Sequence, residues 1–220
     1  MTGGIGFDAW AELAGNSAAS RAEWAAVVDA WSQPHRRYHD LAHLAAVLGI
    51  VGELAEHADD PAAVGLAAWY HDVVYDPTRS DNEALSAPRA RAGLNGLVPD
   101  ARIEEVARLV ELTAGHACAV DDANGAVLCD ADLAVLAGPP EAYAAYASAI
   151  REEYRHYSDE VFTAGRIAVL EQLLGLPALY RLPDVAPDWE PRARGNLAAE
   201  LSLLKARGAS AAADPPPPAG

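Results

Sequence analysis

The apolar positions of this chain recur at helical spacing, and the alternation that marks a β-strand is nearly absent. Between residues 38 and 57, for example, Leu41, Leu44, Ala45 and Leu48 fall on one side of a helix. We therefore expect an all-α protein with one helical-bundle domain over residues 1–208. The pattern predicts helices at about residues 8–13, 21–31, 38–57, 61–75, 81–94, 99–113, 127–136, 141–157, 158–174 and 196–207.

Local signals set the ends of several of these helices. Ser20 is a candidate N-cap for the second helix, and Asp60 followed by Pro61 supplies a cap and a first-turn proline to the fourth. Pro77 ends that fourth helix, because the residue before a proline avoids helical backbone angles. Residues 209–220 include four consecutive prolines, and we expect them to form a disordered tail.

Composition and charge exclude several classes of function. The 220-residue chain has a formal net charge of −16, so we expect no nucleic-acid polymer as a partner, because such binding needs clustered Lys and Arg. No apolar stretch approaches the ~18 residues that cross a bilayer, and the first residues lack a secretory-signal pattern. Cys118 and Cys129 are too few for a disulfide framework and fit a reducing compartment. We expect a cytoplasmic protein without a membrane partner, and the pattern does not predict the oligomeric state.

A His-Asp doublet at the end of an apolar run is the first candidate for chemistry. His71 and Asp72 directly follow Trp69 and Tyr70, so we expect them at the edge of the core. An imidazole and a carboxylate are costly there unless something compensates them. A divalent metal would do so, because His nitrogen and Asp oxygen are good ligands for Zn, Mn or Fe. Trp69 and Tyr70 themselves are expected in the core, although they could also wall a pocket.

Further imidazoles and carboxylates lie upstream and downstream of the doublet. His39 and His43 are four residues apart, which places them one turn apart on the same face of a helix. Asp130 and Asp132 lie in another apolar run, where they require a partner, although Asp130 could instead be a helix N-cap. His116 follows a predicted helix and could be a ligand or interact with the helix dipole.

These pieces, in this order, resemble the HD superfamily of metal-dependent phosphohydrolases. Residues 38–43, Tyr-His-Asp-Leu-Ala-His, resemble the Tyr-His-Asn-x-x-His element of cyclic nucleotide phosphodiesterases, and His71 with Asp72 matches the doublet that names the superfamily. The chain is more closely similar to a bacterial group of predicted metal-dependent HD phosphohydrolases. The elements shared with that group span about residues 24–180 and are Tyr-His-x-x-x-His, Trp-Tyr-His-Asp-x-Val-Tyr-Asp, Asn-Glu-x-x-Ser-Ala, Thr-x-x-His and Asp-Ala-Asp-Leu.

The resemblance implies a metal site and assigns its ligands. Carried over by position, His43, His71, Asp72 and Asp132 would bind a divalent transition metal, with Asp130 as the competing choice for the last ligand. Two imidazoles with two carboxylates suit Mn, Fe, Ni, Co or Zn better than Ca. Four protein ligands would leave positions open on a six-coordinate metal for water and a phosphate oxygen.

The resemblance also implies catalytic roles. Asp72 would orient the attacking water, and His39 or Glu83 would protonate the leaving oxygen of a small phosphoester or phosphoanhydride, such as a nucleotide. Glu83 has an alternative role as the capping-box partner of Ser80 at the start of a helix. Candidates for phosphate contacts, each of which could instead be a solvated surface arginine, are Arg36, Arg37, Arg79 and Arg89.

Two other interpretations stay open at this point. Some HD folds hold two metals, which makes a di-iron oxygenase an alternative, with His116 and Asp76 as spare ligands. The second alternative is a non-catalytic HD domain that binds metal or a nucleotide. Outside these candidate sites, we expect Arg151, Arg166 and Glu153 to form ion pairs on helix surfaces.

Overall fold

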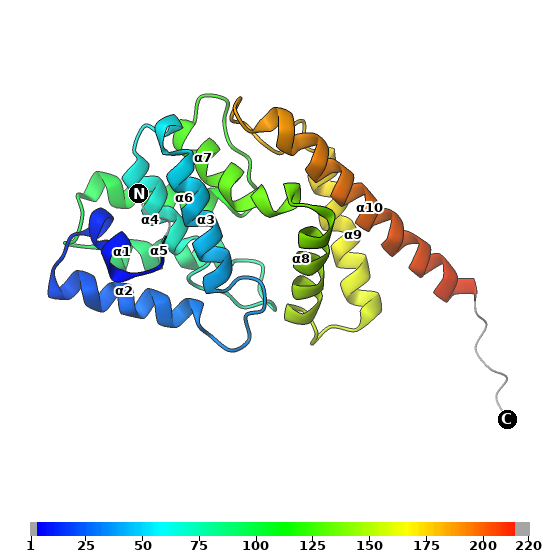
Figure 1. Ribbon diagram of the computed structural model, residues 1–220. Coiled ribbons are helices and arrows are strands. Elements are labelled where there is room, and N and C mark those ends of the chain that lie inside the picture. Colours follow the sequence, from blue (N-terminus) through cyan, green and yellow to red (C-terminus); the bar gives the residue numbers. More distant parts are fainter. Residues whose placement is uncertain (1–3, 214–220) are drawn as a thin grey trace.

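In a computed structural model of the chain, residues 4–213 are described, with side chains described as far as Arg207. These residues form α-helices and two short 3-10 helices, η1 and η2, and contain no β-strand (Figure 1). The all-α prediction is confirmed. The elements are α1 (Phe7–Ala14), α2 (Ala18–Trp31), α3 (Leu41–Glu53), η1 (Ala55–His57), α4 (Pro61–Tyr70), α5 (Asn82–Leu94), α6 (Asp100–Leu112), α7 (Ala123–Asp132), η2 (Leu133–Ala137), α8 (Pro140–Glu153), α9 (Asp159–Gly175) and α10 (Ala186–Ala213).

The central helix, α4, is buried over most of its length. All of its residues from Ala63 to Tyr70 are buried, and it contacts α1, α3, α5, α6 and α7. Small residues let its neighbours approach closely: a Cβ added at Gly65 would lie 3.0 Å from Cδ1 of Leu13. A helix that is apolar on all sides belongs in a protein core. The turn that follows α4 is therefore placed inside the molecule.

Buried tryptophans fill the space around α4. Trp10, Trp31 and Trp69 are fully buried, so Trp69 lies in the core as predicted. The rings of Trp10 and Trp69 meet edge to face, with centroids 5.4 Å apart. The indole N–H of Trp31 donates to the carbonyl oxygen of Trp69 over 2.9 Å, and that of Trp10 donates to Oγ of Ser20 over 2.8 Å. These bonds satisfy polar atoms that burial would otherwise penalise.

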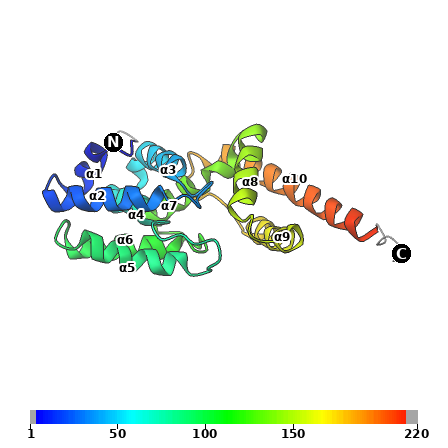
Figure 2. The same ribbon diagram turned by 90° about the horizontal axis from the view of Figure 1, so that it is seen from below.

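A second hydrophobic cluster joins η2 to α8, α9 and α10, at the opposite end of the molecule from α1 and α2 (Figure 2). Tyr180 and Leu197 are among its buried residues. The hydroxyl of Tyr180 donates to the carbonyl oxygen of Leu133 over 2.8 Å, and the side-chain amide of Asn196 donates to that of Leu136 over 2.8 Å. These bonds fix the C-terminal helices against the end of α7 and η2.

Several helix boundaries differ from the prediction. Ser17, not Ser20, caps α2, because its Oγ accepts the backbone N–H of Ser20 over 3.0 Å. The third helix begins at Leu41 rather than at residue 38, and the fourth ends at Tyr70 rather than at residue 75. The fourth ends early because the N–H of Val73 donates to the carbonyl oxygen of Tyr70 over 3.1 Å, and the N–H of Val74, which would continue the helix by bonding to Tyr70, donates to Oγ of Ser86 over 3.1 Å.

The last helix is longer than predicted. It begins at Ala186, because Pro187 lies in the first turn, where its missing N–H costs little. Glu190 then accepts the backbone N–H groups of Leu179 and Tyr180, at 2.9 and 3.1 Å, which holds this part of α10 against the preceding loop. The helix continues to Ala213, past residue 209, where we expected the tail to begin; the rest of that predicted tail, residues 214–220, lies outside the described residues. Among the described helices, none is both long and apolar enough to span a membrane.

Candidate metal centre

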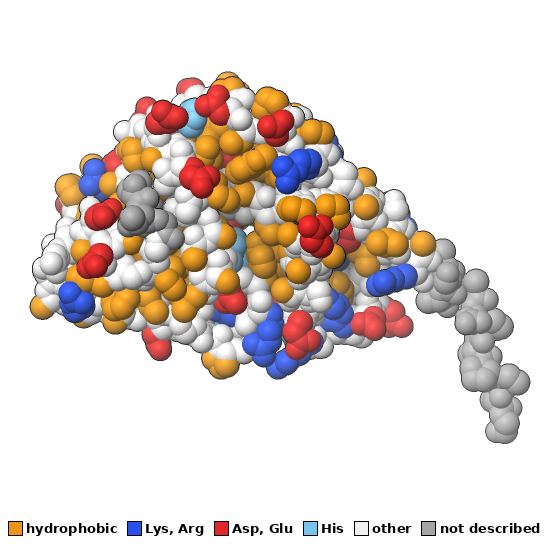
Figure 3. Space-filling model, in the orientation of Figure 1, with side chains coloured by type: hydrophobic (Ala, Val, Ile, Leu, Met, Phe, Trp, Pro, Cys, Tyr) orange, Lys and Arg blue, Asp and Glu red, His pale blue; other side chains and the backbone are white. Residues whose placement is uncertain are grey.

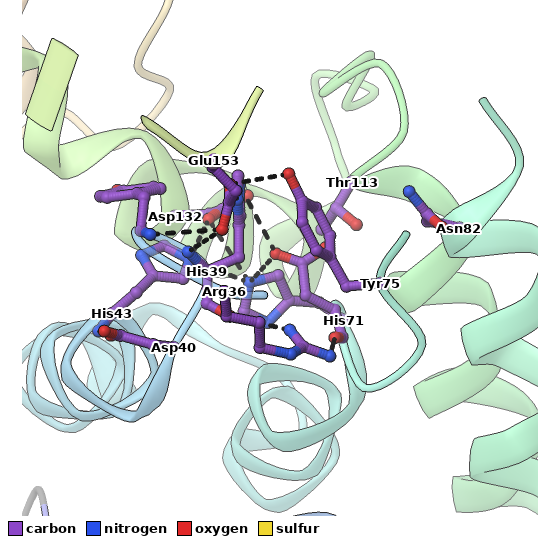
Figure 4. Close-up of polar contacts among 12 residues, drawn as sticks. Arg36, His39, Asp40, His43, His71, Tyr75, Asn82, Thr113, Asp132 and Glu153 are labelled. Carbon is purple, nitrogen blue, oxygen red and sulfur yellow. Dashed lines mark hydrogen bonds and ion pairs between the residues drawn. The ribbon is translucent and has the colours of Figure 1, made fainter. Parts of the chain in front are cut away.

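The predicted ligand side chains of His43, His71 and Asp132 come together where α3, α4 and α7 meet (Figure 4), and Asp72 lies beside His71. His43 lies in the first turn of α3, His71 and Asp72 form the turn after α4, and Asp132 is the last residue of α7. The start of α3 is fixed by Asp40, whose Oδ1 accepts the backbone N–H of His43 over 3.3 Å as an N-cap. Helix ends, rather than helix faces, therefore present most of this site.

The donor atoms of these residues face one another at short range. Nε2 of His43 lies 3.1 Å from Nε2 of His71 and 3.2 Å from Oδ1 of Asp132. Nε2 of His71 lies 3.6 Å from the same Asp132 oxygen and 3.3 Å from Oδ2 of Asp72. The ligand-type atoms of His43, His71 and Asp132 all lie within 4.8 Å of one another. This cluster of imidazole and carboxylate groups could bind a metal ion.

The second nitrogen of His71 fixes the tautomer of the ring. Nδ1 lies 2.8 Å from the carbonyl oxygen of Ala68, which can only accept, so Nδ1 carries the proton and donates. Nε2, the nitrogen that faces His43 and the carboxylates, is then the one left with a lone pair in the neutral ring. A backbone carbonyl in this role is the usual support for a histidine that ligates a metal.

Charge is concentrated in this buried cluster. Burial lowers the pKa of His71, but Asp72 and Asp132 more than offset this and raise it to about 9. For His43 burial dominates, and its pKa is lowered. Burial would raise the pKa of each aspartate, yet the neighbouring His71 outweighs it, and both carboxyls titrate below their usual range. Two ionised carboxylates beside two imidazoles fit a divalent transition metal.

His39 does not share a helix face with His43, so the predicted helical pairing was wrong. It precedes the N-cap of α3 and lies on the connecting loop. The two rings still meet, with centroids 5.7 Å apart, and Nε2 of His39 lies 4.0 Å from Oδ2 of Asp72. His39 therefore reaches the cluster from the side.

Glu153 holds His39 and the loop around it (Figure 4). Its Oε1 accepts the backbone N–H groups of residues 37, 38 and 39 at 2.9, 3.2 and 3.2 Å. Its Oε2 accepts from Nδ1 of His39 over 2.6 Å and from the hydroxyl of Tyr75 over 2.8 Å. Burial raises the pKa of Glu153, but the hydrogen bond and charge of His39 lower it to about 2. The expected helix-surface ion pair of Glu153 was wrong, because its side chain is fully buried.

Arg36 ties the His39 loop to the turn after α4. One guanidinium nitrogen donates to the carbonyl oxygen of His39 over 2.8 Å, and another donates to that of Asp72 over 2.9 Å and that of Val73 over 3.2 Å. Only 4% of Arg36 is exposed, so it is neither a solvated surface arginine nor free for a phosphate. Burial lowers its pKa despite the nearby Asp72. Its contacts hold two candidate site segments at a fixed separation.

Asp132, rather than Asp130, lies among the histidines. Asp130 is fully buried inside α7, which begins at residue 123, and it is therefore not an N-cap. Its carboxylate accepts the backbone N–H groups of Arg181 at 2.9 and 3.0 Å and of Leu182 at 2.8 Å. The second oxygen of Asp132 lies 2.8 Å from Nε2 of His116, whose backbone has a positive φ of 51°. Asp132 thus joins three histidines, and Asp130 anchors the segment before α10.

Glu83 lies near the cluster in the first turn of α5. Burial raises the pKa of its carboxyl, and the negative charge of Asp72 raises it further. The capping box with Ser80 is not formed, because Asp81 occupies the N-cap position of α5. A half-buried carboxylic acid with a raised pKa can retain a proton nearer neutral pH than an exposed one.

The remaining predicted arginines lie on the surface. Arg79 pairs with Asp81 over 2.7 Å, and Arg89 pairs with Glu23 over 2.6 Å. Arg37 is exposed and donates to the carbonyl oxygen of the loop residue Pro34 over 2.7 Å. Of these three, only Arg37 lines a cavity beside the cluster.

That cavity is a groove of about 510 Å³ that reaches His43 and Asp132. Residues of α3 form one wall, the end of α7 with η2 forms another, and Trp189 and Arg192 of α10 also line it. Figure 3 shows a hollow on this face of the molecule with histidine surface inside it. The candidate metal centre is therefore accessible to a small molecule.

Two further features were not found from the sequence. Glu153 and Tyr75 support His39, but Glu153 is 114 residues away from it along the chain, and no spacing rule relates the two. A second group of possible ligand atoms, from Glu56, His57 and Asp184, lies at the surface, where Nε2 of His57 is 3.2 Å from Oδ2 of Asp184. The acidic surface of this chain makes such exposed groups common, and we assign no role to this one.

Comparisons with known proteins find no family model, no curated protein and no solved structure that matches this chain.

Proposed function

We propose that this protein is a metal-dependent phosphohydrolase of the HD type that acts on a small phosphoester or phosphoanhydride, such as a nucleotide. The observation that carries the proposal is the convergence of the His43 and His71 Nε2 atoms on Oδ1 of Asp132, at 3.2 and 3.6 Å. The sequence motifs that resemble the HD superfamily contribute every residue of this cluster. Histidines and carboxylates brought together at helix ends, beside an open groove, are suited to holding a catalytic metal.

His43, His71, Asp72 and Asp132 are the residues that would hold the metal. A bound divalent metal would act as a Lewis acid toward the phosphate and lower the pKa of water. The backbone carbonyl of Ala68 keeps His71 in the tautomer that this role requires. Asp72 stays ionised, because its pKa lies below the usual range, and it can orient the attacking water as a hydrogen-bond acceptor.

His39 is the proposed proton donor. Its Nδ1 is bonded to Glu153, and its Nε2 faces Asp72. Burial lowers the pKa of His39, but Asp72 and Glu153 outweigh this and raise it, which favours the protonated ring. In hydrolysis the water oxygen bonds to phosphorus, the phosphorus–oxygen bond to the leaving group breaks, and that oxygen takes the proton from Nε2 of His39. The proton lost by water passes to solvent by way of Asp72. Glu83 is the second candidate donor, because its raised pKa allows it to hold a proton.

Hydrolysis of a panel of phosphomonoesters, phosphodiesters and nucleotides, followed by chromatographic separation of the products, tests the proposal. Purified protein is incubated with Mn, Fe, Co, Ni or Zn in turn, and the wild type is compared with His39→Asn and Glu83→Gln. We expect turnover with at least one metal and a loss in kcat of about 10²-fold or more in the variant that lacks the true donor. His156→Asn, at an exposed histidine, is the matched control and should keep full activity. Metal binding without turnover of any ester would favour the non-catalytic alternative.

One observation favours a second candidate, a di-iron oxygenase. Nε2 of His116 lies 2.8 Å from the other oxygen of Asp132, so these two residues could help to hold a second metal. The second spare residue, Asp76, is engaged elsewhere, since its Oδ1 accepts from the backbone and hydroxyl of Thr78 at 2.9 and 2.7 Å. Two irons per chain and near-ultraviolet absorption after loading with iron would support this candidate. One metal per chain, with phosphate release, would favour the hydrolase.

A further inference from the structure

The groove beside the candidate metal centre has an apolar floor and walls. Ala42, Ala46 and Ile50 follow one another at four-residue spacing along α3 and form one wall. Ala134 and Val135 of η2 contribute to the other wall. At about 1.5 Å per residue, the seven steps from His43 to Ile50 carry this apolar surface about 10 Å along the helix from the metal ligands. Water forms no hydrogen bonds with such a surface, whereas an apolar ligand group is stabilised by being buried against it.

Aromatic surface adds to the groove. Trp189, which is only partly buried, lines it from α10, whereas Trp10, Trp31 and Trp69 are fully buried in the core. Tyr38 lines it from the loop before α3. Flat rings bordering a groove favour a ligand with a flat apolar body. The volume of about 510 Å³ holds a group of one or two rings.

The groove lining is formally neutral rather than acidic, because Arg37 and Arg192 balance the carboxylates of Asp40 and Asp132. Arg37 and Arg192 both line it, although the chain carries a formal net charge of −16. Within the described residues, neither has a carboxylate within 4.0 Å, whereas Arg79, Arg89 and many other arginines are paired. Both arginines are exposed, and although Nη1 of Arg37 donates to two backbone carbonyl oxygens, its other nitrogens are available to an anion. Within an acidic molecule, this groove therefore offers an anionic ligand two positively charged contacts.

We propose that the groove binds the organic part of an anionic phosphate ester, and that this part is an apolar or aromatic group. The inference rests on the proposed function for one point only, the placement of the transferred phosphoryl group at the His43 and Asp132 end. The groove then discriminates between phosphate esters by their organic group. Esters with a small polar organic group make few apolar contacts with the groove walls and bind weakly, so they are poor substrates.

Binding of two phosphonates, which cannot be hydrolysed at the phosphorus–carbon bond, tests the groove without requiring turnover. Isothermal titration calorimetry compares 2-naphthylphosphonate with methylphosphonate on Mn-loaded protein. We expect the naphthyl compound to bind at least about 10-fold more tightly, because burying an aromatic group of this size contributes that much or more. In Ala46→Phe, which fills the groove from an exposed position of α3, this preference should disappear.

Ala101→Phe is the matched control, because residue 101 is an exposed alanine of α6 and does not line the groove. It should keep the full preference for the naphthyl compound. Arg192→Gln should weaken binding of both phosphonates by a few-fold and reduce the dependence of that binding on salt. Equal affinities of the wild type for the two phosphonates, or a preference that survives in Ala46→Phe, would overturn the groove assignment.

Hydrolysis of 2-(2-naphthyl)ethyl phosphate and ethyl phosphate, whose leaving groups are both primary alkoxides of similar basicity, separates this inference from the proposed function. Release of phosphate from both esters at equal kcat/KM would support the proposed hydrolase function and refute the proposal that the groove binds the organic group. Binding of the naphthyl compound that depends on residue 46, without any release of phosphate, would refute the hydrolase and leave the groove as a ligand site. We expect the naphthylethyl ester to be the better substrate by at least about 10-fold in kcat/KM, with the advantage lost in Ala46→Phe.

Discussion

Replacing Glu153 with glutamine changes one oxygen of the carboxylate that holds His39. The retained oxygen can still accept the three backbone N–H groups of residues 37–39. The new amide nitrogen, in contrast, is a donor placed where Oε2 now accepts from Nδ1 of His39 over 2.6 Å and from the hydroxyl of Tyr75 over 2.8 Å. The hydroxyl can rotate and accept instead, but the protonated imidazole cannot. His39 therefore loses its hydrogen-bond acceptor, whereas the backbone N–H groups of residues 37–39 keep theirs.

The size of the effect follows from these contacts. A hydrogen bond to a charged group contributes about 1.5–3 kcal/mol, and a buried donor left without a partner costs about 1–3 kcal/mol. The side chain of Glu153 is fully buried, so solvent does not weaken the bond. We expect Glu153→Gln to lower the free energy of unfolding by about 3 kcal/mol. If His39 is the proton donor, kcat should fall by about 10²-fold while KM changes little, because Glu153 does not line the groove.

Urea denaturation followed by circular dichroism measures the first effect, and steady-state phosphate release measures the second. Glu152→Gln is the matched control, because its neighbour Glu152 is exposed and pairs with Arg155 on the surface of α8. This control should change neither stability nor kcat appreciably. If Glu153→Gln is no less stable than Glu152→Gln, the hydrogen-bond network around His39 is wrong. A loss of stability with kcat unchanged would leave the network intact and remove His39 as the proton donor.

Three further predictions concern the carboxylates and the ion pair between α9 and α10. Asp130→Asn should lower the free energy of unfolding by about 1–3 kcal/mol and leave the metal content unchanged. Asp132→Asn, in contrast, should lose the metal. The reverse pattern in elemental analysis would contradict the assignment of Asp132 as the ligand. Arg166 binds the carboxylate of Glu200 through two nitrogens at 2.8 and 2.9 Å. Arg166→Met should lower the free energy of unfolding by about 3–5 kcal/mol, because it leaves this carboxylate without its partner. A urea midpoint equal to that of the wild type would refute this. Burial raises the pKa of Glu200, but Arg166 outweighs it and lowers the pKa. The stability advantage of the wild type over Glu200→Gln should therefore be full above the usual glutamate pKa of about 4.3 and shrink as the pH falls below it, and an advantage that grows on acidification would contradict the ion pair.

Helical periodicity was sufficient to predict the class of the fold, because apolar side chains repeat at the spacing that buries one face of a helix. Trp69 was placed in the core for the same reason, since α4 is apolar on all sides. Local caps such as Asp60 were also found, because they act over three residues. The end of α4 was missed, because Ser86, a residue of α5, takes the N–H of Val74 that would have continued the helix.

The candidate site was predicted in part. Motif order placed His43, His71 and Asp132 in one cluster, and the structure brings them together. Spacing alone suggested a shared helix for His39 and His43, which is wrong because Asp40 caps α3 between them. The burial of Arg166 and Glu153 could not be predicted, because each depends on a partner from another helix or loop rather than on its own sequence neighbours.

Metal content tests the central claim, that His43, His71, Asp72 and Asp132 form a metal site. Elemental analysis of purified protein compares the wild type with His71→Ala/Asp72→Ala and His43→Gln, each checked for helical content by circular dichroism. We expect about one transition metal per chain in the wild type and little in the folded variants. Wild-type protein that takes up no metal after incubation with Mn, Fe, Ni and Zn, or a His43→Gln variant that keeps a full complement, would contradict the account.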